Sequence, residues 1–250
     1  MQLIDIDFTK LNYNFNKKNT ICIGFFDGVH KLHQKIMLKT KSIAKENNES
    51  FSIMTFSKKV SDFLKNQSNN LQSKKVKYQI LQNLFEPDYL FEIQVNKKTI
   101  SKSKSEFISY LKDILNANHI IVGSDFTFGY KREGKIDDLY EAFGKENVYV
   151  FNRNFNYSTS NLKQLLYEGK IEQLNDKIGY FYKVILKKIP NKSNTYKIHQ
   201  SNSILKNGYY LCSINNKEIK IKFENNVTYL KNEFNYFDSI SIEIIKYLNK

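Results

Sequence analysis

Two histidines lie three residues apart, directly after a short apolar run, and their surroundings favour phosphate chemistry. The run is Thr20–Phe25, whose β-rich composition is typical of a buried strand. The pair Asp27-Gly28 interrupts it, and His30 and His33 follow on the first turn of a predicted helix. Residues three apart share one face of a helix, and the free N–H groups of a helix start attract phosphate. Two imidazoles at such a place can donate hydrogen bonds to the phosphate oxygens of a nucleotide.

A chance spacing, or one half of a zinc site, would also account for the histidine pair. The chain has two cysteines and four histidines, so it offers few zinc ligands. The zinc motifs CxxC and HExxH do not occur in the sequence. On local chemistry alone these alternatives stay open.

A second candidate is the loop GSDFTFG, residues 123–129, which follows the apolar run HIIVG. Glycines at both ends permit a sharp backbone path close to a ligand. Asp125 can accept hydrogen bonds, and Phe126 and Phe128 offer flat apolar faces to a ring system. The alternative is a loop that buries two aromatic rings.

A third candidate is the stretch YSTSNLK, residues 157–163. The hydroxyls of Ser158 and Thr159 stand at a predicted helix start, where they can cap the helix or hold a phosphate, and Lys163 adds a positive charge. A further glycine pattern, Gly129 with Gly134-Lys135, lacks the Ser or Thr that binds magnesium in a P-loop, because Ile136 comes next.

The elements that must position these residues alternate between strand and helix. Strands are predicted at 20–25, 50–56, 89–95, 119–123 and 148–151. Helices are predicted at 32–44, 76–84, 107–115, 136–143 and 158–168, with a capping box at Ser103 and Glu106. This alternation predicts an α/β fold with a doubly wound parallel sheet. If the first and fourth of these strands flank the reversal of strand order, the loops that carry His30 and Asp125 lie at the same edge of the sheet.

The pattern changes near residue 178. Residues 181–186 alternate like a strand, and Asn215-Asn216 is a hairpin turn between two further strands. We therefore predict two domains, an α/β domain at 1–178 and a small β-rich domain at 179–250.

Composition excludes some classes of protein. The chain has 250 residues, 41% of them hydrophobic, and a formal charge of +14. Its lysines are spread along the whole chain, so the charge is weak support for a nucleic-acid partner. There is no apolar run long enough to span a bilayer and no signal peptide pattern. We expect no membrane partner and a reducing, cytoplasmic setting.

The three candidate stretches resemble the motifs of one family, the prokaryotic FAD synthetases. GFFDGVHKLHQ resembles the family's nucleotide-binding motif, with Leu32 in place of a glycine. GSDFTFG and YSTSNLK resemble its two later motifs, with Lys163 in place of an arginine. The family's proline motif after Thr55-Phe56 is absent.

The resemblance implies a Rossmann-like nucleotidyltransferase that makes FAD and pyrophosphate from FMN and ATP, with Mg²⁺ accompanying ATP. It implies catalytic roles for His30, His33 and Lys163. The residues implied for ATP binding are Gly24, Phe26, Asp27, His30, His33, Ser158, Thr159 and Lys163. Asp125 and Phe128 are implied for flavin binding.

Bacterial members of the family usually carry a riboflavin kinase barrel after this domain. Its GxPTAN motif is absent here, since Pro190 is followed by Asn191. Residues 179–250 are therefore interpreted as a remnant of that barrel, without kinase activity. The alternatives to FAD synthesis are adenylyl transfer to another phosphorylated acceptor, a catalytically impaired nucleotide- or flavin-binding protein, and a basic nucleic-acid binder.

Overall fold

The computed structural model describes residues 1–10, 13, 15–152, 157–199, 204–230 and 237–248. It consists of two compact units that interleave along the sequence. The parallel-sheet unit comprises Met1–Phe26, Leu32–Ser68 and Leu81–Asn154. The antiparallel-sheet unit comprises Asp27–Lys31, Asn69–Ile80 and Phe155–Lys250.

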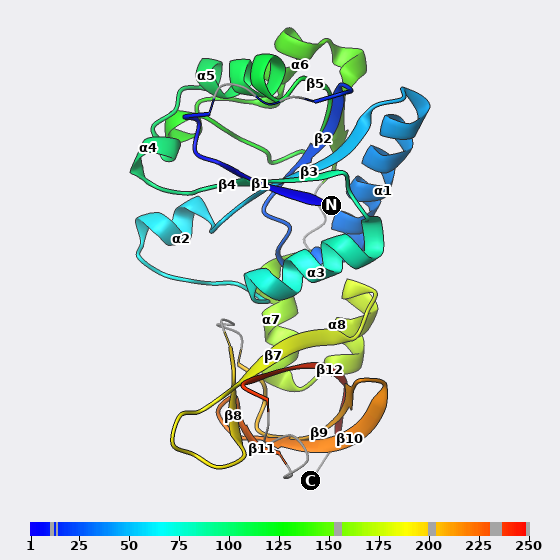
Figure 1. Cartoon of the computed structure of the whole chain (residues 1–250), viewed down its shortest axis with the longest axis vertical. Helices are drawn as coiled ribbons and strands as arrows, with labels where there is room; N and C mark the ends of the chain where they lie inside the picture. The colour runs from blue at the N-terminus through cyan, green and yellow to red at the C-terminus, as the bar shows by residue number, and fades with distance from the viewer. Residues whose placement is uncertain (11–12, 14, 153–156, 200–203, 231–236, 249–250) are drawn as a thin grey trace. The chain divides into compact units, whose positions relative to one another are not determined.

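The parallel-sheet unit is built on six strands in the order β1-β4-β3-β2-β5-β6, and every neighbouring pair is parallel (Figure 1). The strands are β1 (Gln2–Ile6), β2 (Asn19–Ile23), β3 (Ser50–Phe56), β4 (Tyr89–Ile93), β5 (Ala117–Gly123) and β6 (Val148–Phe151). The helices between them are α1 (Lys31–Glu46), α2 (Val60–Leu64), α3 (Lys74–Phe85), α4 (Lys97–Ile100), α5 (Lys104–Ser109) and α6 (Ile136–Phe143). The predicted α/β class is confirmed. The short helices α2 and α4 were not predicted.

Strand order reverses between β2 and β5, because β3 and β4 extend the sheet on one side and β6 on the other. These are the first and fourth of the strands predicted from the sequence, so the predicted switch point is confirmed. In open parallel sheets, ligands bind beyond the carboxyl ends of the strands at such a point. The loops after β2 and β5 both leave the sheet at this edge.

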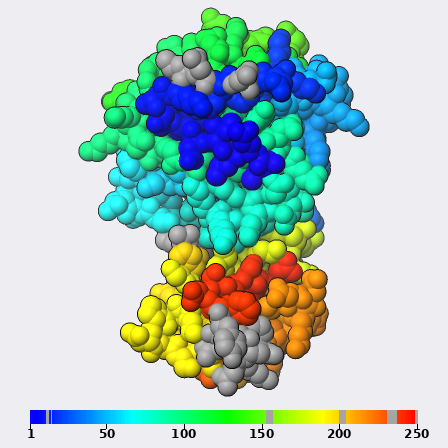
Figure 2. Space-filling model, in the orientation of Figure 1, coloured from blue at the N-terminus to red at the C-terminus, as the bar shows by residue number. Residues whose placement is uncertain are grey.

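One face of the sheet is covered by α5 and α6 (Figure 1). Their apolar residues share a core with alternate residues of the strands, among them Ile21, Phe91 and Ile120. Right-handed crossovers place α1 on the opposite face, where it buries Ile36, Met37 and Ile43. The N-terminal residues, dark blue in Figure 2, lie on the surface of this unit.

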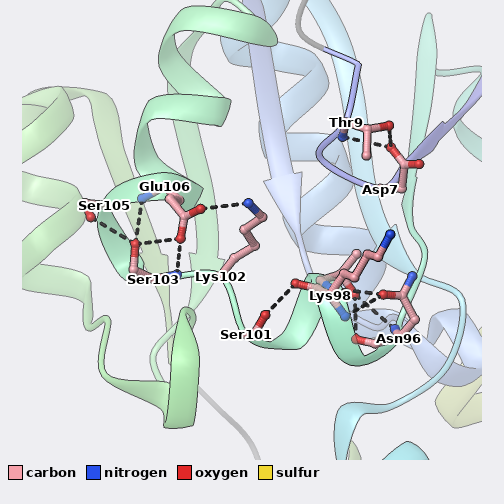
Figure 3. Close-up of polar contacts among 10 residues, drawn as sticks. Asp7, Thr9, Asn96, Lys98, Ser101, Lys102, Ser103, Ser105 and Glu106 are labelled. Carbon is pink, nitrogen blue, oxygen red and sulfur yellow. Dashed lines mark hydrogen bonds and ion pairs between the residues drawn. The ribbon is translucent and has the colours of Figure 1, made fainter.

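Helix α5 begins with the capping box predicted from the sequence (Figure 3). The Ser103 hydroxyl accepts from Glu106 N at 3.2 Å, and the Glu106 carboxylate accepts from Ser103 N at 2.9 Å. The predicted helix does not continue unchanged to Leu115. It passes into a π-helical turn, η2 (Tyr110–Ile114). The Tyr110 hydroxyl at the start of this turn donates a hydrogen bond to Lys10 O at 3.0 Å.

The described residues of the antiparallel-sheet unit form a six-stranded sheet in the order β10-β9-β12-β7-β8-β11. Its strands are β7 (Tyr182–Lys188), β8 (Thr195–Ile198), β9 (Gly208–Ile214), β10 (Lys217–Phe223), β11 (Val227–Tyr229) and β12 (Ser239–Leu248). The predicted hairpin turn is confirmed: Asn215 and Asn216 join β9 to β10 with φ values of 49° and 64°. Asparagine tolerates this left-handed conformation better than most residues, which suits a two-residue hairpin loop.

Helices α7 (Thr159–Glu168) and α8 (Ile171–Ile178) belong to the antiparallel-sheet unit. Their buried residues, such as Leu162, Leu166 and Leu174, share one core with Leu186 and Tyr210 of the strands. The predicted boundary after residue 178 therefore differs from the division of the structure. The apolar faces of both helices are buried by the β strands, and a pattern of single elements does not reveal this pairing.

Among the described residues, no helix combines the length and the apolar character needed to cross a bilayer.

Candidate functional site

The backbone turns sharply where β2 ends. Gly24 N donates to Met54 O at 3.1 Å, which continues the pairing with β3 by one residue. A Cβ atom at Gly24 would lie 2.7 Å from the Phe26 ring, so this position must be glycine while that ring is folded back. Phe26 itself is buried and has a φ of 52°, which is rare for an aromatic residue.

The Phe26 ring contacts the side chain of His33, the third residue of α1. The two rings meet edge to face, with 5.2 Å between centroids. His33 is half-buried, and so is Leu32 beside it. Spacing alone predicts that Leu32 joins Ile36 on the buried face of α1, but neither core cluster of the described residues includes Leu32.

Residues Asp27–Val29 form a 3₁₀ turn, η1, in the antiparallel-sheet unit. Both carboxylate oxygens of Asp27 lie 3.0 Å from Leu71 N, which donates to them. Gly28 has a φ of +72°, and a Cβ atom there would lie 2.5 Å from Leu71 Cδ2. The turn is thus fitted closely to the segment that begins at Asn69.

His30 follows this turn and directly precedes α1, whereas the sequence predicts it within the first helical turn. The side chain is buried, and its ring lies 5.3 Å from the Tyr157 ring. Burial lowers the pKa of His30 from 6.5 to about 4. The imidazole is therefore neutral at pH 7 and offers one N–H donor rather than a positive charge.

Helix α7 presents the hydroxyl-rich stretch. Ser158 caps the helix, and its Oγ accepts from Asn161 N at 3.2 Å. Thr159 and Lys163 are four residues apart and so lie on one face. The Lys163 ammonium donates to Asn69 Oδ1. Leu162, on another face, is buried in the core of the unit.

The loop after β5 is closed by hydrogen bonds. Phe126 N donates to Gly123 O at 3.0 Å, and Gly134 N donates to Phe128 O at 2.8 Å. Phe128 is buried in the core, whereas Phe126 is half-buried and stacks on it at 5.7 Å. Asp125 is exposed. The partly exposed aromatic face of this loop therefore belongs to Phe126.

The predicted site residues fall into two groups. Those in the antiparallel-sheet unit are Asp27, His30, Ser158, Thr159 and Lys163. Those in the parallel-sheet unit are Gly24, Phe26, His33, Asp125 and Phe128, and all of them except His33 lie on the loops after β2 and β5. Asn69 and Leu71 were not predicted as neighbours of the motif residues, because they come from a polar stretch with no pattern of its own.

Among the described residues, no group of three or more His, Cys, Asp or Glu side chains forms a candidate metal cage. Mg²⁺ is commonly held by substrate phosphates with one or two carboxylates, and a dedicated cage is not needed for that mode.

Residues 13–160 match the family model described as FAD synthetase. A bifunctional riboflavin kinase/FMN adenylyltransferase from Buchnera aphidicola subsp. Schizaphis graminum is 32% identical over 174 residues, which cover 66% of this chain and 55% of the relative. An FAD synthetase from Listeria monocytogenes is 27% identical over 168 residues, which cover 64% of this chain and 68% of the relative. The chain spans about half the length of the first bifunctional relatives it matches.

A solved structure described as a macrolide-efflux protein from Streptococcus pneumoniae superimposes with a TM-score of 0.80. The superposition covers 100% of this chain and 92% of the chain in that structure, at 15% sequence identity. At that identity the likeness shows a shared fold.

Proposed function

Because the chain belongs to the FAD synthetase family, we propose that it is an FMN adenylyltransferase, which forms FAD and pyrophosphate from FMN and ATP. The observation that carries the proposal is the turn after β2. It joins a buried strand to the start of α1 at the switch point of a parallel sheet, and it contains His30 and precedes His33. A helix start at a switch point is a favourable place for a nucleotide phosphate.

In the proposed reaction, a phosphate oxygen of FMN attacks the α-phosphorus of ATP in line. The bond from the α-phosphorus to the bridging oxygen of the β-phosphate breaks, and pyrophosphate leaves with that oxygen. Mg²⁺ enters as part of the Mg–ATP substrate and offsets phosphate charge. The protein's contribution is then to position the phosphates and to stabilise the charge that develops.

His30 and His33 are proposed to donate hydrogen bonds to the ATP phosphates and the leaving pyrophosphate. A neutral His30 offers one N–H donor, and the approach of phosphate charge would favour its protonated form, which offers two. Ser158, Thr159 and Lys163 are proposed to hold the β- and γ-phosphates. The start of α7 supports this role through its N–H groups and through the nearby Lys163 charge.

Gly24, Phe26 and Asp27 are proposed to line the adenosine and α-phosphate side. The Asp27 carboxylate already accepts from Leu71 N, so part of its role would be to hold the turn in shape. Asp125 and Phe128 are proposed for the flavin side. Burial of Phe128 suggests that it acts by supporting the half-buried ring of Phe126.

Riboflavin kinase activity is not part of the proposed function. The segment that would carry the kinase's GxPTAN motif reads Pro190-Asn191-Lys192-Ser193 and lacks its Thr. A cytoplasmic location is part of the proposal, and it is supported by two buried cysteines that are both free thiols.

The test is incubation of the purified protein with FMN and Mg–ATP, with FAD measured by chromatography. We expect FAD and an equal amount of pyrophosphate. In parallel, riboflavin replaces FMN, and we expect no FMN above the control without protein. ATP consumption with a different acceptor and no FAD would instead favour the alternative transferase. Failure to bind either substrate would refute the proposal.

A further inference from the structure

The turn that precedes His30 has an unfavourable backbone conformation. Phe26, Gly28 and Val29 have φ values of 52°, 72° and 34°. A β-branched residue such as Val29 is rarely found at positive φ, because its side chain crowds the backbone there. Such conformations persist where surrounding contacts hold them, and they are common where a protein binds ligands.

One contact that holds this turn comes from the segment that follows α8. Tyr180 Oη donates to Gly28 O at 2.7 Å. Its second neighbour is Gln72 Oε1 at 3.1 Å. A hydroxyl has one hydrogen, and the shorter distance assigns it to the Gly28 carbonyl. Burial raises the pKa of Tyr180, so the hydroxyl remains a donor throughout the neutral range.

A second tyrosine holds the backbone of Leu71, the residue that binds Asp27 in the turn. Tyr182 Oη donates to Leu71 O at 2.6 Å. The N–H group of the same residue, Leu71, donates to the Asp27 carboxylate. The two tyrosines therefore fix two neighbouring pieces of backbone, one directly and one through Leu71.

We propose that Tyr180 is a positioning residue that fixes the Gly28–Val29 peptide and thereby the orientation of His30 toward the ATP phosphates. The inference rests on the proposed function for the role of His30. A planar peptide rotates as one body, so a held Gly28 carbonyl also fixes the direction of Val29 N–H and the path of the chain into His30. The β-rich region thus has a role in adenylyl transfer, although it lacks the GxPTAN motif.

The test compares Tyr180→Phe with Tyr196→Phe. Tyr196 is buried in the same unit, and its hydroxyl donates to Phe237 O at 3.1 Å, within the β-rich region. Each variant loses a part-buried hydrogen bond from a tyrosine hydroxyl to a backbone carbonyl. In hydrogen exchange without nucleotide, we expect the amides of residues 27–31 to exchange at least about tenfold faster in Tyr180→Phe alone, as local opening becomes easier.

The kinetic readout separates positioning from general destabilisation. In Tyr180→Phe we expect kcat for FAD formation to fall between about tenfold and 10²-fold, with the KM for FMN nearly unchanged. Tyr196→Phe should keep the kcat of the natural protein. In a His30→Ala background, Tyr180→Phe should have little further effect, because both changes act through the same imidazole.

Equal exchange and equal kcat in the two Phe variants would overturn the inference. So would an effect of Tyr180→Phe that stayed undiminished in the His30→Ala background. A natural protein that formed no FAD would refute the proposed function, and the exchange comparison would still decide whether Tyr180 holds the turn.

Discussion

The rings of Phe26 and His33 meet edge to face at an interplanar angle of 82°, so an aromatic residue of the turn packs directly on a residue proposed to bind phosphate. Edge-to-face contacts of this kind stabilise one ring orientation over others. Phe26 is buried while His33 is half-buried. The fixed ring therefore limits the rotamers of the more accessible one.

The two histidines can be tested by replacing each with alanine. If each donates to phosphate oxygens that gain charge in the transition state, each replacement should lower kcat by about 10²-fold. His30→Ala should also lower Tm, because His30 is buried, and His33→Ala should lower it less. The control is His199→Ala in the β-rich region. FAD formation at the control rate in either variant would contradict the assignment.

The buried His30 predicts a dependence of stability on pH. Its pKa is about 4 in the folded protein and near 6.5 when unfolded, so the unfolded chain binds the extra proton between these values. This contribution to stability is fully present above pH 6.5 and is lost as pH falls toward 4. Denaturant unfolding should show that the natural protein loses about 2 kcal/mol more than His30→Gln between pH 7.5 and pH 5. Parallel losses in the two proteins would show that His30 is not held neutral.

Lys163 can be tested through the affinity for ATP. Lys163→Ala should raise the KM for ATP by about tenfold, the usual effect of losing one charged hydrogen bond. Lys163→Arg, which keeps the charge, should stay closer to the natural value. Lys170→Ala serves as the control, since Lys170 pairs with Glu168 at 2.7 Å on the same unit. An unchanged KM in Lys163→Ala would remove this residue from the site.

Gly28 offers a test of the close fit against Leu71. Gly28→Ala should destabilise the protein by about 1 kcal/mol for the left-handed backbone and by a further 1–3 kcal/mol for the clash with Leu71. Gly179, the C-cap of α8, has a similar φ of 78° and is exposed. Gly179→Ala should therefore show mainly the backbone cost. If both variants lost the same stability in thermal unfolding, the Leu71 side chain would have moved aside without an energetic cost.

Leu32 stands where the resembling motif has glycine. Leu32→Gly should lower Tm, since it loses roughly 1 kcal/mol of helix propensity and some burial. We expect no gain in FAD synthesis, on the basis that the side chain is accommodated at the start of α1. A several-fold rise in kcat/KM for ATP would show instead that Leu32 crowds the nucleotide, and that the natural protein is an attenuated enzyme.

Five strands of the parallel sheet could be predicted from the sequence, because each of them is a compact apolar run bounded by turn residues. Thr20–Phe25 and residues 50–56 illustrate this. The position of the switch point was taken from the usual order of doubly wound folds, and the observed strand order confirms it. Caps with two partners close in sequence, such as Ser103 and Glu106, were also predictable. Local chemistry determines both kinds of feature.

Contacts between distant segments could not be predicted. Leu71 meets Asp27 across 44 residues, and Tyr180 meets Gly28 across 152 residues. Neither Leu71 nor Tyr180 belongs to a recognisable motif. The burial of His30 and its lowered pKa could not be predicted from the sequence for the same reason, because both arise from residues that the tertiary structure brings together.

The interleaving of the two units along the chain has an evolutionary consequence. Neither unit is a continuous piece of polypeptide, so a single recombination event cannot replace one whole unit with the corresponding unit of another protein. A chain that stopped after residue 178 would keep α7 and α8 but lose the strands whose core buries Leu162, Leu166 and Leu174. Those leucines would then face water, and the product would tend to aggregate. Selection that preserves the hydroxyl-rich start of α7 therefore also preserves the β strands.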